Sequence, residues 1–155
     1  MATERERKFL VTGGAWRAQV VSERAIRQAY LASTPHAAIR IRISDDSKAV
    51  LTIKSAEPGI ERSEFEYAVP LVDAEAMIAL RTGEVIEKRR HVVPAGDLTW
   101  EIDVFAGAHD GLVMAEIELP TQDTPFESPD WLGEEVTGDR RYYNASMALG
   151  EGAGD

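Results

Sequence analysis

Three charged side chains near the amino terminus, Glu4, Glu6 and Lys8, are the first residues whose types and spacing suggest chemistry. They stand two residues apart in the stretch ERERKFLV (Glu4–Val11), and this spacing places all three on one face of a β-strand. Carboxylates are the ligands that hard divalent cations prefer, and basic side chains suit phosphate groups. Such a face is either solvated or turned toward a charged ligand.

Pairs of like charge recur on other segments that alternate with period two. Within each pair the two side chains share a strand face and stand about 7 Å apart. The pairs are Arg40 and Arg42, Glu64 and Glu66, Lys88 and Arg90, Glu101 and Asp103, and Glu116 and Glu118. A solvated sheet face usually mixes both signs with Thr, Ser and Gln. This sorting favours a charged interior, and an open sheet with its charges in water is the alternative.

The alternating segments predict a mainly β protein. They are Glu4–Val11, Ala37–Ser44, Lys48–Ala56, Glu61–Pro70, Glu84–Val93, Leu98–Ala106 and Leu112–Pro120. Short turn sequences separate many of them, at 44–47, 57–59, 94–97 and 107–111. Such short connections favour antiparallel hairpins. We expect a sandwich or a closed barrel, and closure has the advantage of removing exposed strand edges.

Helical spacing is recognised in three places. Ser22–Leu31 has a capping serine and apolar residues at helical spacing, and Asp73–Arg81 has a capping aspartate and a stop at Gly83. Asn144–Leu149 predicts a third helix, and the acidic stretch WLGEEVTGD at 131–139 predicts a lid or turn before it. We expect one domain over residues 1–150 and a disordered tail at 151–155.

Composition excludes several classes of protein. The 155 residues are 44% hydrophobic, which is typical of a globular domain, and the formal net charge of −10 disfavours a nucleic-acid binder. Cysteine is absent, so there is no disulfide or thiolate metal site. The sequence shows no apolar run near 18 residues and no signal-peptide pattern. We therefore expect a cytoplasmic protein that does not enter membranes.

A charged face turned inward would line a channel with both signs of charge. Buried charges must be paired or must bind a charged ligand. Arginine and lysine clusters suit phosphates, and carboxylate clusters suit Mg²⁺ or Mn²⁺ that bridge to substrate phosphates. The combination predicts a site for a polyphosphate carried with its metal, and phosphoryl-transfer chemistry.

The sequence also resembles the CYTH superfamily, the triphosphate tunnel metalloenzymes. ERERK matches the opening motif E-x-E-x-K, and further blocks follow in the same order over nearly the whole chain. These blocks are QAYL (28–31), IRIR (39–42), LTIK (51–54), ERSEFEY (61–67), EKRR (87–90), WEIDVF (100–105), GLVMAEIEL (111–119) and WLGEEVTGDRRYYNASMA (131–148). The resemblance implies a closed eight-stranded antiparallel barrel, open as a tunnel, with a charged lumen and flanking helices outside.

The resemblance also implies roles for individual residues. The metal ligands would be Glu4, Glu6, Glu116 and Glu118, with Glu64 and Asp103 as further acids that bind metal or position water. The phosphate contacts would be Lys8, Arg40, Arg42, Lys54, Arg62, Lys88 and Arg90. Tyr30, on the predicted helix, would reach the tunnel and influence substrate choice. The general base would be Lys88, Glu66 or a metal-activated water.

The implied activity is hydrolysis of a linear triphosphate with Mg²⁺ or Mn²⁺, with one or two metal ions. The sequence shows no obvious aromatic clamp for an organic head group, which favours inorganic tripolyphosphate, cleaved to pyrophosphate and phosphate. The alternatives are thiamine triphosphatase, class IV adenylyl cyclase, and a non-catalytic module that binds polyphosphate or nucleotide. The oligomeric state stays open, with a homodimer as one alternative.

Overall fold

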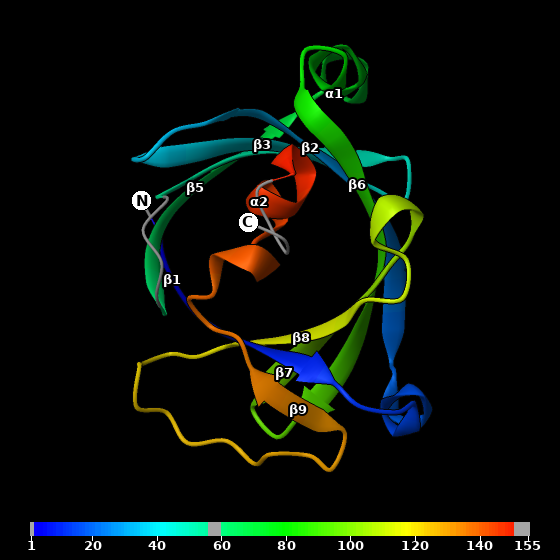
Figure 1. The fold of residues 1–155 in the computed structure, drawn as a ribbon, viewed down its shortest axis with the longest axis vertical. Helices are drawn as coiled ribbons and strands as arrows, with labels where there is room; N and C mark the ends of the chain where they lie inside the picture. Colours follow the sequence, from blue (N-terminus) through cyan, green and yellow to red (C-terminus); the bar gives the residue numbers. More distant parts are fainter. Residues whose placement is uncertain (1, 56–59, 151–155) are drawn as a thin grey trace.

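The strands of this protein form an antiparallel sheet that closes into a barrel, as a computed structural model of residues 2–55 and 60–150 shows (Figure 1). The strand order is β5-β4-β3-β2-β6-β7-β8-β1-β9, and β5 pairs in addition with β1. Eight strands therefore complete the ring, and β9 lies beyond it. The strands are β1 (Ala2–Val11), β2 (Ser22–Ser33), β3 (Ala37–Ser44), β4 (Lys48–Ser55), β5 (Glu61–Val69), β6 (Thr82–Ala95), β7 (Leu98–Phe105), β8 (Val113–Glu118) and β9 (Leu132–Glu135). The predicted fold class is confirmed.

Strand β1 joins the two ends of the sheet. Its first half, Ala2–Arg5, pairs with β5, and Glu6–Leu10 pairs with β8 on the opposite edge. Further along, Phe9 and Val11 pair with β9 on the edge that β5 has left. The acidic opening motif thus lies at the seam where the barrel closes.

The outer, apolar face of the barrel is covered by a helix and by loops. Helix α1 (Leu71–Ile78) places Ala74 and Ile78 against Ile41 and Ile43 of β3. On the other side, Trp100 of β7 is central to a cluster of edge-to-face aromatic contacts with Phe9, Phe126 and Trp131. Because this face is covered, the charged face of each strand is left to line the interior.

Helix α2 (Asn144–Leu149) closes one end of the barrel from within. Met147 and Ala148 pack against Ile86 and Phe105, which belong to the inward faces of β6 and β7. Figure 1 shows α2 inside the ring of strands rather than on its outer surface. The expectation that the helices lie outside an open tunnel is therefore wrong for α2, because the apolar end of the lumen needs a partner to bury it.

Gly83 of β6 makes this arrangement of α2 feasible. Its φ of +70° is in the left-handed region, and a Cβ added there would lie 2.2 Å from the Ala148 carbonyl oxygen. No side chain fits between this backbone and the helix. Gly83 is thus required for close packing of α2, whereas the sequence predicted it as the stop of α1.

The predicted helix over Ser22–Leu31 is wrong, since this segment is strand β2 and pairs with both β3 and β6. Its residues fit both the helical and the strand period. In the strand, Ala29 and Leu31 join the outer cluster under α1, while Arg24 and Tyr30 line the interior. Pairing with two neighbouring strands satisfies the backbone on both edges and overrides the helical pattern.

The remaining predicted elements agree with the structure to within two residues at the described strand ends. Helix α1 begins at Leu71, two residues before the predicted cap, with Pro70 at the N-cap and Asp73 in the first turn. Helix α2 is confirmed, and β9 occupies part of the stretch predicted as a lid or turn. The turn at 57–59 and the tail at 151–155 lie outside the described residues. No helix in the described part of the chain is long and apolar enough to cross a membrane.

Candidate active site

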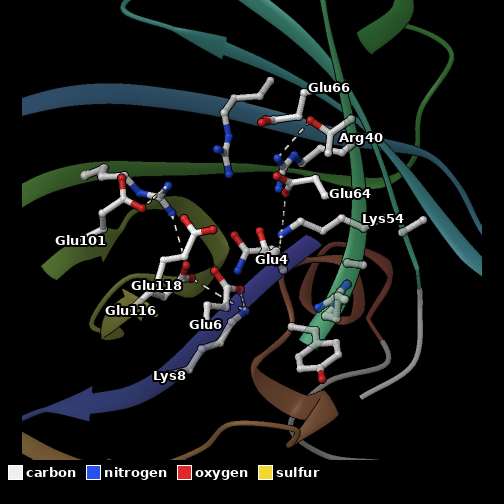
Figure 2. A pocket seen from close by; sticks show the side chains of 18 of the residues that line it. Glu4, Glu6, Lys8, Arg40, Lys54, Glu64, Glu66, Glu101, Glu116 and Glu118 are labelled. Atoms are coloured by element: carbon white, nitrogen blue, oxygen red, sulfur yellow. Dashed lines mark hydrogen bonds and ion pairs between the residues drawn. The ribbon is translucent and has the colours of Figure 1, made fainter. Parts of the chain in front are cut away.

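The barrel interior contains a cavity that brings together nearly every predicted site residue (Figure 2). The predicted site residues that line this cavity are Glu4, Glu6, Lys8, Tyr30, Arg40, Arg42, Lys54, Arg62, Glu64, Glu66, Lys88, Arg90, Glu116 and Glu118. Asp103 lies behind this lining, with 1% of its surface exposed. The alternative of an open sheet with solvated charges is therefore excluded by closure of the barrel around these side chains.

Three arginines in the cavity have no acidic partner within ion-pair distance among residues 2–55 and 60–150. Arg40 donates to Thr52 Oγ1 at 3.2 Å, and its Nε is buried without a hydrogen-bond partner. Arg42 donates to Gln28 Oε1 at 2.8 Å, and Arg62 to the Ser55 carbonyl at 3.1 Å. Arg40 and Arg62 are buried and Arg42 is partly buried, and guanidinium groups with neutral partners form a ready site for an anion with several oxygens.

The positive charge on this side of the cavity is concentrated. Burial and the neighbouring Arg40 and Arg90 lower the pKa of Arg42 to about 9. The cost of holding these cations together falls when a polyanion binds between them. The electrostatics of the free protein therefore favour a ligand with several negative charges.

Carboxylates gather across the ring from Arg40 and Arg42, where β1 and β8 pair. Glu6 lies directly across from Glu118 in the strand register, an arrangement of like charges that destabilises a sheet. Figure 2 shows Glu4, Glu6 and Glu118 directed toward one another. Burial and the nearby Glu116 raise the pKa of Glu6 to about 7, and burial together with Glu4 and Glu6 raises the pKa of Glu118.

These carboxylates suit a divalent cation that also contacts substrate. Among the described residues, no group of three His, Cys, Asp or Glu side chains forms a complete metal site. Mg²⁺ typically takes one or two carboxylates, keeps several waters and binds substrate phosphates. The facing glutamates, with their raised pKa values, fit this pattern, because a bound cation would relieve their mutual repulsion.

Two lysines lie among the carboxylates. Lys54 Nζ lies 3.0 Å from Glu4 Oε1 and 3.5 Å from Glu64 Oε2. Lys8 Nζ lies 3.8 Å from both Glu6 and Glu116, at the long end of ion-pair distances. Glu66 is exposed on β5.

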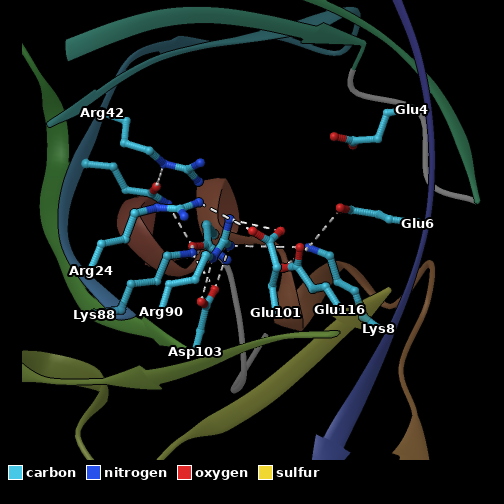
Figure 3. A network of polar contacts seen from close by, with 12 residues as sticks. Glu4, Glu6, Lys8, Arg24, Arg42, Lys88, Arg90, Glu101, Asp103 and Glu116 are labelled. Carbon is cyan, nitrogen blue, oxygen red and sulfur yellow. Dashed lines mark hydrogen bonds and ion pairs between the residues drawn. The ribbon is translucent and has the colours of Figure 1, made fainter. Parts of the chain in front are cut away.

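Asp103 organises the most deeply buried part of the site (Figure 3). Its carboxylate accepts two hydrogen bonds from Arg90, at 2.7 and 2.8 Å, and lies 2.7 Å from Lys88 Nζ. Burial would raise the pKa of Asp103, but Arg90 and Lys88 hold it well below its usual range. Both oxygens are thus engaged by cations, which favours a positioning role over the predicted metal ligation.

Lys88 lies between this carboxylate and two arginines. Burial lowers the pKa of Lys88 to about 7, and repulsion from Arg90 and Arg42 adds to the effect while Asp103 opposes it. An amine with a pKa near neutrality can take up a proton during a reaction. The geometry is therefore consistent with the predicted role of Lys88 as a general base.

Several lining residues were not among the predicted site residues. They are Arg24, Ala38, Thr52, Glu101, Tyr143, Asn144 and Ala145. The helix predicted over Ser22–Leu31 gives no indication of Arg24 and places Tyr30 on the wrong kind of element. Parity along the strand would have put Arg24, Gln28 and Tyr30 on the inward face. Tyr143 and Asn144 come from the C-terminal segment, and no local pattern indicates that it enters the barrel.

A closed antiparallel barrel whose lumen holds both a carboxylate cluster and arginines without acidic partners has the charge distribution of a site for a polyanion and a cation. The chain belongs to the CYTH domain family, whose model matches residues 2–146. This finding confirms the family resemblance recognised in the sequence.

Two inorganic triphosphatases are similar to this chain over almost its full length. An inorganic triphosphatase of Acetivibrio thermocellus is 40% identical over 148 residues, covering 95% of this chain and 94% of the relative. One of Nitrosomonas europaea is 35% identical over 151 residues, covering 95% and 97%. A crystal structure of an inorganic triphosphatase superposes with a TM-score of 0.70 at 33% identity, covering 96% of both chains.

Proposed function

We propose that this protein hydrolyses inorganic tripolyphosphate to pyrophosphate and orthophosphate inside the barrel, with the help of a divalent cation. The observation that carries the proposal is the set of three arginines without acidic partners, in a cavity that also holds carboxylates that repel one another. The names of the relatives at 40% and 35% identity support the same substrate.

The basic residues would bind the phosphate chain. Arg40, Arg42 and Arg62 have donors to spare, and the lysines Lys8 and Lys54 can turn from their carboxylate partners to a phosphate oxygen. As the bond to the terminal phosphorus breaks, negative charge develops on the pyrophosphate that leaves. Fixed cations around that oxygen stabilise the transition state without reorganising during the reaction.

The proposed metal is Mg²⁺ or Mn²⁺, held by Glu4, Glu6, Glu116 and Glu118. When bound, such a cation neutralises phosphate charge and makes the phosphorus more open to attack. Glu116 is already held ionised: burial opposes this, but Lys8 and Arg90 keep its pKa well below the usual range. Glu64, paired with Lys54, is placed to complete the acidic set.

The attacking water would give its proton to Lys88. The oxygen of this water forms a bond to the terminal phosphorus. The bond from that phosphorus to the bridging oxygen breaks, and pyrophosphate leaves. Lys88 and the alternative base, Glu66, both line the cavity, but Lys88 is 4% exposed whereas Glu66 is exposed and lies on β5, in the opposite part of the ring. Asp103 would keep Lys88 and Arg90 in place rather than bind metal.

An organic head group has little to bind in this lining. Within the described lining, the aromatic side chains are Tyr30 and Tyr143, and the Tyr143 ring is already approached by Lys8 Nζ at 5.1 Å and Arg62 Cζ at 4.9 Å. Helix α2 closes one end of the barrel, so the head group of a bound substrate would have to extend through the other end. These features favour a substrate made of phosphates alone.

The proposal is tested by incubating the protein with Mg²⁺ or Mn²⁺ and equal concentrations of tripolyphosphate, ATP or thiamine triphosphate. We expect orthophosphate release to be fastest from tripolyphosphate and to require the metal. Pyrophosphate release from ATP would instead indicate cyclase chemistry, and binding without turnover would indicate a receptor.

Metal binding should depend on pH through Glu6. Because its pKa is raised to about 7, the fold favours protonated Glu6, and this stabilising effect is lost as pH rises from below 4.5 through 7. Mg²⁺ needs the ionised form, so the rise in melting temperature caused by added Mg²⁺ should be larger at pH 8 than at pH 6.

Glu6→Gln should abolish most of this metal-induced rise and the metal-dependent turnover. Glu127→Gln, at an exposed loop position, is the matched control and should behave as the wild type. Full metal-dependent turnover in Glu6→Gln would refute the assignment of the metal ligands.

A further inference from the structure

We propose that Asn144, the first residue of α2, is a positioning residue for Lys88, and that Gln28 holds Asn144 in the required orientation. The inference rests on the proposed function, since it concerns how the hydrolytic site is assembled. It gives the C-terminal helix a part in the reaction beyond closing the barrel.

The hydrogen bonds around Asn144 fix its orientation. Asn144 Oδ1 accepts from Lys88 Nζ at 2.8 Å and from Gln28 Nε2 at 2.7 Å. Gln28 Oε1 in turn accepts from Arg42 Nε at 2.8 Å. Arginine offers hydrogen atoms only, so the Gln28 oxygen must face Arg42 and the Gln28 amide nitrogen must face Asn144. Asn144 Oδ1 is therefore the atom that accepts, and Arg42 sets the direction of every bond in this chain whether Lys88 is protonated or neutral.

Asn144 and Asp103 together determine what Lys88 presents to the cavity. A lysine nitrogen has three directions besides its bond to carbon. The Asp103 carboxylate takes one at 2.7 Å, and Asn144 Oδ1 takes a second at 2.8 Å. The third direction is then fixed as well, and it is the one left for a ligand in the cavity that Lys88 lines.

The helix that carries Asn144 is held on both sides of this residue. Before it, the Tyr143 ring lies 5.1 Å from Lys8 Nζ. After it, Met147 and Ala148 are buried in the apolar end of the lumen, where Gly83 allows the close approach. Asn144 itself is 8% exposed, and Gln28 is fully buried. The amide oxygen is thus placed by rigid elements, as a precise site requires.

Leucine has nearly the shape of asparagine and is one atom shorter than glutamine, and it cannot accept a hydrogen bond. We expect Asn144→Leu to lower kcat for Mg²⁺-tripolyphosphate about 10- to 100-fold while KM changes less than about threefold, since a misplaced Lys88 affects mainly the transition state. Gln28→Leu should lower kcat in the same direction. The double variant should lose less than the product of the two single losses, because both changes break one chain of contacts.

Ser146→Ala, on the same helix and outside the site, is the matched control and should retain wild-type kcat. Thermal unfolding of each variant shows whether the fold is kept, and Gln28→Leu serves as the test if Asn144→Leu does not fold. A wild-type kcat in either leucine variant, or losses that multiply in the double variant, would overturn the inference. Absence of turnover in the wild type would contradict the proposed function, and the inference would fall with it.

Discussion

Replacing Lys88 with methionine is expected to lower kcat for tripolyphosphate by about 100- to 10,000-fold, the range that general-base catalysis supplies. Methionine keeps the length and apolar stem of lysine, so it fits the buried position beside Phe105. It cannot take a proton from the attacking water. Binding of Mg²⁺-tripolyphosphate, measured by calorimetry, should weaken far less, because the three unpaired arginines remain.

Two variants make this result specific. Lys48→Met, at an exposed position at the start of β4, should leave kcat unchanged. Glu66→Gln tests the alternative base and should lower kcat less than Lys88→Met. If Glu66→Gln is the more damaging change, or if Lys88→Met keeps near wild-type kcat, Lys88 is not the base.

Replacing Asp103 with asparagine is expected to have the largest effect on stability. The change removes the negative charge that lies against both cations. Lys88 then has no acidic partner within ion-pair distance among the described residues, and Arg90 keeps only its longer contacts with Glu101 at 3.4 Å and Glu116 at 3.9 Å. Removal of one partner from such a buried network costs about 3–5 kcal/mol. For a domain of this size, that loss corresponds to a fall in melting temperature of roughly 10 °C. Turnover should fall as well, because both cations would leave their positions.

Asp123→Asn provides the control, since it removes the same charge from an exposed loop. We expect its melting temperature to stay within about 2 °C of the wild type, as is usual for surface substitutions. If Asp103→Asn melts as the wild type but no longer responds to Mg²⁺, Asp103 is a metal ligand, as the sequence resemblance first implied.

The inward charged faces could be predicted from sequence because strand parity is a local property. Pairs such as Arg40 with Arg42 and Glu116 with Glu118 remain on one face wherever the strand lies. Parity does not say which face of a closed sheet is inside. The family resemblance supplied that information, and the fold and the cavity lining agree with it.

Features that depend on distant contacts could not be predicted in this way. Ser22–Leu31 fits both the helical and the strand period, and its pairing with β3 and β6 decides between them. The hydrogen bond between Gln28 and Asn144 joins residues 116 positions apart, and no spacing in the sequence indicates it. Asp103 has the parity of a lumen acid, but its depth and its contacts with Arg90 and Lys88 emerge only in three dimensions.

The most direct test of the central claim is ³¹P NMR of tripolyphosphate incubated with the protein and Mg²⁺ in water enriched in ¹⁸O. We predict equal amounts of orthophosphate and pyrophosphate, with one ¹⁸O atom entering the orthophosphate, because water attacks the terminal phosphorus. Tripolyphosphate that stays intact while bound to the protein, or ¹⁸O that appears in pyrophosphate instead, would contradict the account.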